Sequence, residues 1–88
     1  MIKKEFILEN KVGLHARPAA KLVETVNKFE SNVIITKNNR EANGKSILHV
    51  LALGAERGDK ILIKVNGADE ENAMNEIENL VKSKFYEE

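Results

Sequence analysis

The sequence has 88 residues, enough for one compact domain spanning 1–88 and too few for two. Its 14 Lys and Arg residues balance 14 Asp and Glu residues, which argues against binding nucleic acid or a membrane surface through net charge. The absence of cysteine excludes disulfides and thiolate metal ligands. No stretch is long and apolar enough for a membrane span, and the first residues lack the apolar core of a signal peptide, so we expect a cytoplasmic protein.

The first half of the sequence predicts a strand, a helix and a β-hairpin. Residues 2–8 place apolar side chains at even positions, which is the period of a half-buried strand. Apolar residues then recur at helical spacing over 18–29, and Pro18 suits the first turn of a helix, where its missing N–H is not needed. The β-branched stretch 31–37 predicts a second strand. Two asparagines follow it and allow a tight turn into a short return strand over 40–42.

The second half predicts a short helix, a strand and a final helix. Ser46 is a candidate N-cap for an apolar helix over 47–53, which Gly54 can close. In residues 60–65, Ile61, Ile63 and Val65 alternate with Lys60, Leu62 and Lys64, as the two faces of an amphipathic strand do. Acidic residues, with Asp69 as a candidate cap, suit the start of the last helix. The buried stripe of that helix is predicted to be Ala73, Ile77, Leu80 and Val81. The order β-α-β-β-α-β-α favours an α+β fold with helices on one face of an antiparallel sheet.

His15 stands just before the first predicted helix, with Arg17 beside it. The first N–H groups of a helix carry partial positive charge and favour an anion, and the guanidinium fork fits phosphate. A histidine that is neutral near pH 7 has one ring nitrogen with a free lone pair, so this arrangement suits covalent capture of a phosphoryl group. Gly13 allows a close backbone approach or a positive φ. Residue types alone also fit a solvated loop histidine beside an ordinary surface arginine.

The stretch GLHARPAAKLV resembles the active-site signature of the HPr family, the histidine-containing phosphocarriers of the sugar phosphotransferase system. The resemblance continues in NKF after the first helix, GKSI before the second and GADEENA at the start of the last. It implies an open-faced β-sandwich, in which a four-stranded antiparallel sheet is covered on one side by three helices. Neither a second general acid or base nor a metal motif accompanies His15, so we expect a carrier without turnover of its own, cofactor or metal.

The resemblance also implies a role for each site residue. His15 would accept the phosphoryl group on Nδ1 from phospho-Enzyme I, itself charged by phosphoenolpyruvate, and pass it to an Enzyme IIA. Arg17 would neutralise the phosphoryl oxygens during transfer. Ser46 falls where relatives are phosphorylated by HPr kinase in carbon catabolite control, and the alternative for Ser46 is simple helix capping. The implied partners are Enzyme I, Enzyme IIA domains, HPr kinase and a catabolite regulator. We expect the protein itself to be a monomer.

The second predicted helix departs from the family pattern. Leu48 and Leu51 replace methionines, and His49 stands where glycine is usual. One sheet face cannot bury so many apolar side chains, so some of them must be exposed, as in a partner surface. The resemblance implies that Ile47, Leu48 and Leu51 form this docking surface, and we expect His49 to lie on it as well. Leucine repacks less readily than methionine, which would narrow the choice of partners. Three interpretations of His49 stay open: an exposed polar residue of the docking face, a contact that tunes a partner's phosphohistidine, and a metal site shared with His15.

Two other classes of protein compete with this interpretation. A nitrogen-type regulatory phosphocarrier has the same fold, and the C-terminal SKFYEE is somewhat similar to that branch, whereas GKSI favours the sugar type. The order β-α-β-β-α-β also fits a ferredoxin-like module that binds RNA or a small effector. RNA-binding sheets need exposed aromatic residues and basic charge, and this neutral chain has three Phe, one Tyr and no Trp. A ligand-binding module would not explain the presence of the His-Ala-Arg-Pro motif.

Overall fold

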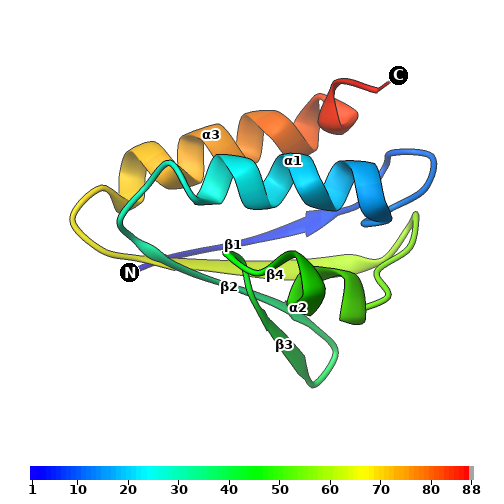
Figure 1. Ribbon diagram of the computed structural model, residues 1–88, viewed down its shortest axis with the longest axis horizontal. Coiled ribbons are helices and arrows are strands. Elements are labelled where there is room, and N and C mark those ends of the chain that lie inside the picture. The colour runs from blue at the N-terminus through cyan, green and yellow to red at the C-terminus, as the bar shows by residue number, and fades with distance from the viewer. Residues whose placement is uncertain (88) are drawn as a thin grey trace.

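The computed structural model describes residues 1–87. Within them four strands, three α-helices and one short 3-10 helix, η1, follow one another (Figure 1). Their bounds are β1 Ile2–Ile7, α1 Ala16–Val26, β2 Asn32–Lys37, β3 Arg40–Asn43, α2 Ile47–Ala52, β4 Lys60–Asn66, α3 Glu70–Lys82 and η1 Lys84–Tyr86. The predicted order β-α-β-β-α-β-α is confirmed, with η1 added after the last helix.

The four strands form one antiparallel sheet in the order β1-β4-β2-β3. Ile2 of β1 pairs with Val65 of β4, and Ile35 of β2 pairs with Ile63 on one side and Ala42 of β3 on the other. Figure 1 shows α1 and α3 side by side over the sheet, with α2 next to β3. In a ferredoxin-like sheet the first and third strands are central. Here β4 and β2 are central, so the ferredoxin-like alternative is wrong.

The core lies between the sheet and the helices. The alternation predicted for β4 is confirmed, since its three apolar side chains at odd positions are buried. The predicted stripe of α3 is buried as well, and Phe85 of η1 is completely enclosed. Burying this apolar surface supplies the main favourable term in folding. The core residues from β4, α3 and η1 are Ile61, Ile63, Val65, Ala73, Met74, Ile77, Leu80, Val81 and Phe85.

Several predicted boundaries need correction. The largest difference is at the end of α1, which is Val26 and not residue 29, because the N–H groups of Lys28 and Phe29 bond to carbonyls only three residues earlier. Helix α1 begins at Ala16, two residues before Pro18, so Pro18 stands inside the first turn and His15 becomes the N-cap residue. A proline fits anywhere in this turn because its N–H would have no intrahelical partner. Strand β1 ends at Ile7, one residue early. Leu8 is nevertheless buried in the core, since its backbone N–H bonds to the carbonyl of Asp59 (3.0 Å) and keeps the chain against the sheet.

Asp69 holds the N-cap position of α3, but its carboxylate does not cap that helix. The carboxylate instead accepts hydrogen bonds from the backbone N–H groups of Glu30 (2.9 Å) and Ser31 (3.0 Å) and from the Ser31 hydroxyl. The Ser31 hydroxyl, followed by the Glu30 N–H, lowers the pKa of Asp69. The turn between α1 and β2 has backbone donors that need partners, and Asp69 satisfies them in preference to the helix.

No helix found between residues 1 and 87 combines the length and the apolar character needed to cross a membrane.

Candidate functional site

His15 is placed where α1 begins. Its backbone is extended (φ −75°, ψ −175°), and its carbonyl accepts the first helical hydrogen bond from Ala19 (2.9 Å). The imidazole makes no capping bond to the helix, and 55% of the side chain is exposed. First-turn N–H groups lack intrahelical partners, and here they belong to Ala16 and Arg17 because Pro18 has none. The ring therefore lies at the positive end of the helix without being used to cap it.

Backbone hydrogen bonds join the loop that leads to His15 and the loop between α2 and β4. The N–H of Leu14 donates to the carbonyl of Ala55 (2.9 Å), and the N–H of Gly58 donates to the carbonyl of Leu8 (2.7 Å). Gly13 has φ +64°, and a Cβ there would lie 2.5 Å from the Ala55 oxygen. Only glycine tolerates both conditions, so both properties predicted for Gly13 are confirmed. The loop before α1 and the loop between α2 and β4 thus run in direct backbone contact.

This contact brings Glu56 to His15. The two carboxylate oxygens of Glu56 lie 3.0 and 3.2 Å from Nε2 of the imidazole. Both side chains are more than half exposed. The sequence analysis missed Glu56, and no local motif marks it, because the contact depends on the pairing of two loops that are distant along the chain.

Arg17 lies in the first turn of α1, with 82% of its side chain exposed. Its Nε is 3.5 Å from a carboxylate oxygen of Glu87, and Nζ of Lys21 is 3.6 Å from the same oxygen. Lys21 also donates to the carbonyl of Phe85 (2.7 Å), whose ring is buried. These contacts hold the C-terminal segment against the first turns of α1. Glu87 is thus a second residue near the site that the sequence analysis missed.

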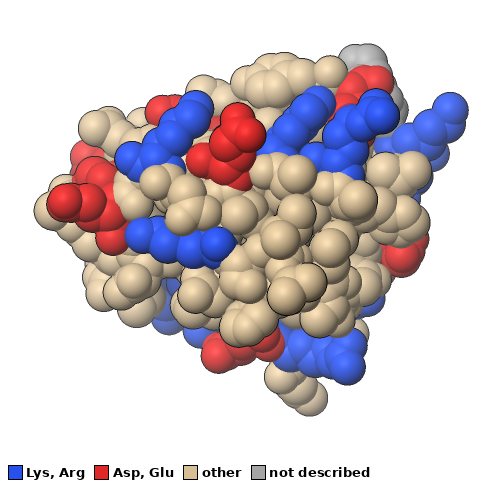
Figure 2. All heavy atoms as spheres, in the orientation of Figure 1, with Lys and Arg blue, Asp and Glu red and all other residues tan. Residues whose placement is uncertain are grey.

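Helix α2 has the polar start and apolar surface that the sequence predicts. Oγ of Ser46 accepts a hydrogen bond from the His49 N–H (3.3 Å), which confirms Ser46 as the N-cap. The exposed fractions of Ile47, Leu48 and Leu51 are 38%, 75% and 37%, and we call these three residues the α2 patch. Figure 2 shows an uncharged surface over α2 near the centre of the view, bordered by Lys and Arg side chains and, above and below, by some Asp and Glu side chains.

His49 is exposed on α2 and borders a shallow hollow that Arg40 and Glu41 also line. Among residues 1–87, no three or more His, Asp or Glu side chains are grouped so that they could hold a metal ion. A metal site shared by His49 and His15 therefore gains no support.

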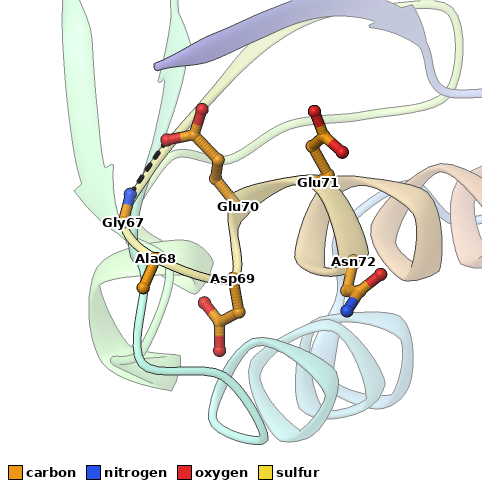
Figure 3. Close-up of a pocket in the computed structure, with 6 residues that line it drawn as sticks. All are labelled: Gly67, Ala68, Asp69, Glu70, Glu71 and Asn72. Atoms are coloured by element: carbon orange, nitrogen blue, oxygen red, sulfur yellow. Dashed lines mark hydrogen bonds between the residues drawn. The ribbon is translucent and has the colours of Figure 1, made fainter.

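Another hollow lies at the start of α3 and is lined by residues 67–72. Figure 3 shows the Asp69 and Glu70 side chains leaving the helix start in different directions, with Glu70 accepting a hydrogen bond from the Gly67 N–H (3.1 Å). Three carboxylates line this hollow, so it repels anions. The N-terminal end of α1 therefore suits a phosphoryl group better than the N-terminal end of α3 does.

The fold and the site are those of a class of small α+β phosphocarriers, in which a histidine occupies the N-cap position of the first helix on one face of an antiparallel sheet. Comparison with known proteins supports this class. The family model described as "PTS HPr component phosphorylation site" matches residues 2–83. The phosphocarrier protein HPr of Xylella fastidiosa is 43% identical over 88 residues, covering 100% of this chain and 99% of its own. That of Neisseria meningitidis serogroup A is 40% identical over 87 residues, covering 99% and 98%.

Solved structures agree with the sequence comparison. The crystal structure of HPr-C-His from Thermoanaerobacter tengcongensis superposes with a TM-score of 0.97 at 41% identity, over 100% of this chain and 99% of that one. HPr from Bacillus anthracis gives a TM-score of 0.87 at 34% identity, over 91% and 95%. The chain belongs to the HPr family, the phosphocarrier proteins of the phosphotransferase system. It is a carrier rather than an enzyme, and its four-stranded sheet with three helices is the family fold.

Proposed function

We propose that residues 1–88 act as one phosphocarrier domain that carries the phosphoryl group on Nδ1 of His15. The group comes from phospho-Enzyme I, which is charged by phosphoenolpyruvate, and goes to an Enzyme IIA in sugar uptake. The observation that supports this most is the placement of His15, an exposed ring at the start of α1 that takes no part in capping the helix. A nucleophile in this position needs no rearrangement of the fold to meet a donor.

The surroundings of His15 suit an arriving phosphoryl group. The positive end of α1 favours negative charge, and two cations, Arg17 and Lys21, lie in the first two turns of the helix. Glu87, which Arg17 meets at 3.5 Å, is only 17% exposed, but the Arg17 side chain is 82% exposed and reaches solvent. Its guanidinium can therefore turn to the phosphoryl oxygens, and charge-assisted contacts of this kind act most strongly in the transition state.

The α2 patch and His49 form the proposed docking surface for Enzyme I and Enzyme IIA. An exposed apolar patch with a polar border is typical of a protein interface. Ala55 follows α2 closely and bonds to Leu14, so the patch and the histidine belong to joined segments. A titration with Enzyme I, followed by backbone amide shifts, should move residues 46–53. If these amides stay unchanged while another surface responds, the docking assignment is wrong. The carrier would work as a cytoplasmic monomer.

Ser46 is proposed as a regulatory phosphorylation site for HPr kinase, with consequences for a catabolite regulator. Its Oγ already accepts the His49 N–H, and a phosphate oxygen can take over that bond. The added charge would stand beside the α2 patch and would have to be desolvated whenever a partner covers it. Modification at Ser46 should therefore weaken docking more than it weakens the fold.

The central experiment is an intact mass measurement after incubation with phosphoenolpyruvate and a bacterial Enzyme I. The wild-type chain should gain one phosphoryl mass, in an adduct that is labile in acid and stable in base. His15→Ala should gain none, and a phosphoryl mass on that variant would refute the assignment. Offering the charged carrier to a sugar-type and a nitrogen-type Enzyme IIA then decides between the two branches.

A further inference from the structure

We infer that Glu56 is a positioning residue for His15, and that its carboxylate keeps the ring proton on Nε2 so that Nδ1 presents the lone pair. The inference rests on the proposed function of His15 and adds a residue from a distant loop to that site.

The proton position follows from the chemistry of the two partners. A carboxylate has no proton to donate, so it can only accept a hydrogen bond from Nε2. Both oxygens of Glu56 lie within hydrogen-bonding distance of that nitrogen, at 3.0 and 3.2 Å. A neutral imidazole carries a single N–H, and when this proton is on Nε2 the free lone pair is on Nδ1. The contact therefore selects the tautomer that phosphoryl transfer through Nδ1 requires.

The backbone around Glu56 holds this carboxylate in place. Ala55, the preceding residue, is bonded to Leu14 and lies against Gly13, one and two residues before the histidine. The backbone N–H of Glu56 donates to a carboxylate oxygen of Asp59 (2.7 Å). That bond, followed by the Lys37 ammonium 3.1 Å away, lowers the pKa of Asp59 and keeps it ionised. The carbonyl of Glu56 in turn accepts a hydrogen bond from the Asp59 N–H (3.0 Å), so the backbone is held on both sides of Glu56 and little backbone reorganisation precedes the reaction.

The same carboxylate assists the transfer itself. The Nδ1 lone pair forms the N–P bond while the donor's bond to phosphorus breaks and its electron pair returns to the donor. His15 loses no proton in this step, because the only ring proton is on Nε2. The ring becomes an imidazolium, whose charge the Glu56 carboxylate neutralises. In delivery the N–P bond breaks and its electrons return to the ring, which leaves as neutral imidazole. A paired negative charge thus favours the reactive cationic form in both directions.

The test compares Glu56→Gln and Glu56→Ala with a control of equal charge change, Glu5→Gln. Glu5 is exposed on β1 and opposite Leu62 of β4, on the sheet face that the helices leave uncovered. Long-range ¹H–¹⁵N correlation spectra of the neutral imidazole report the tautomer directly. Wild type and Glu5→Gln should show protonated Nε2, and Glu56→Ala should shift towards protonated Nδ1. The kcat of phosphorylation by phospho-Enzyme I should fall about two- to fivefold in both Glu56 variants, the size of an exposed ion pair, without a rise in KM.

An unchanged tautomer in Glu56→Ala, or a kcat for both Glu56 variants equal to that of Glu5→Gln, would overturn the inference. Failure of the proposed function looks different, since the wild-type chain itself would then accept no phosphoryl group. The tautomer spectra need no partner protein and remain informative in that case.

Discussion

The contact between the two loops beneath His15 can be tested with Gly13→Ala. The added Cβ would lie 2.5 Å from the Ala55 carbonyl oxygen, 2.6 Å from Cα of Glu56 and 2.8 Å from its carbonyl carbon. All three are backbone atoms, which cannot swing aside as a flexible side chain does. The substitution therefore has to push the loop between α2 and β4 away from the loop before α1.

The cost has three physical parts. Holding a non-glycine residue at the observed φ of +64° costs about 1–2 kcal/mol. Separating the loops weakens the hydrogen bond from Leu14 to Ala55, worth about 1 kcal/mol. Overpacking of this kind costs about 1–3 kcal/mol. Together these parts amount to a loss of about 3–6 kcal/mol, which would lower the Tm of a chain this size by about 12–48 °C.

Gly54→Ala is a matched control for this substitution. Gly54 has nearly the same backbone angle, φ +62°, but nothing lies within 4 Å of a Cβ placed there. Only the cost of the positive φ remains, so Gly54→Ala should lower the free energy of unfolding by about 1–2 kcal/mol. Urea unfolding of both variants measures the difference, which isolates the clash with the Glu56 loop. Equal losses in the two variants would show that the loops are not in close contact and would refute the reasoning.

Three further predictions concern charge. Arg17→Ala should slow phosphorylation of His15 about tenfold or more while Tm stays almost unchanged, because the guanidinium is exposed and acts on the transition state. Ser46→Asp should raise the KM for phosphorylation by Enzyme I with stability preserved, so the initial rate at carrier concentrations below KM should fall. Lys4 and Lys82, each 2.6 Å from Glu78, lower the pKa of Glu78 to about 2. The stabilisation from this carboxylate is present above its ordinary pKa of 4.5 and is lost as the pH falls towards 2. As the pH falls over that range, the free energy of unfolding measured in urea should therefore decrease less for Glu78→Gln than for wild type.

Each of these predictions has a contrary outcome. A large fall in Tm for Arg17→Ala with intact transfer would indicate a structural role for the guanidinium. Equal initial rates for Ser46→Asp and wild type would leave Ser46 as a cap alone. An identical pH dependence of stability in wild type and Glu78→Gln would mean that the two lysines do not stabilise the ionised carboxylate.

Features set by local pattern could be predicted from the sequence. Strand β4 and helix α3 follow from their periods, because one buried face repeats every second residue or every turn. Ser46 could be assigned as a cap from its type and position alone. The strand order could not be derived in this way, since periodicity says which face is buried and nothing about which strand is the neighbour. The family resemblance implies a four-stranded antiparallel sheet, and the order of its strands was not predicted.

The missed residues share one property: their contacts join segments that are distant in sequence. Glu56 reaches His15 from a loop 41 residues away, and Glu87 meets Arg17 because Phe85 is buried near α1. Asp69 is a further example. Its position before α3 predicts a helix cap, but its carboxylate accepts hydrogen bonds from the turn around Ser31, which is distant in sequence. An acidic side chain in a polar loop has no periodic signal, so only the folded chain shows what it binds.

The sheet order also affects how the chain folds while a ribosome makes it. Strand β1 is synthesised first but lies at an edge of the sheet and pairs only with β4. Its apolar residues therefore wait unpaired until residue 66 has left the exit tunnel, and the core stays open until Phe85 follows. The hairpin of β2 and β3 is the first sheet pairing that a growing chain can make. A nascent chain that pauses before β4 would leave β1 unpaired, and an unpaired strand can associate with a chaperone or with another chain.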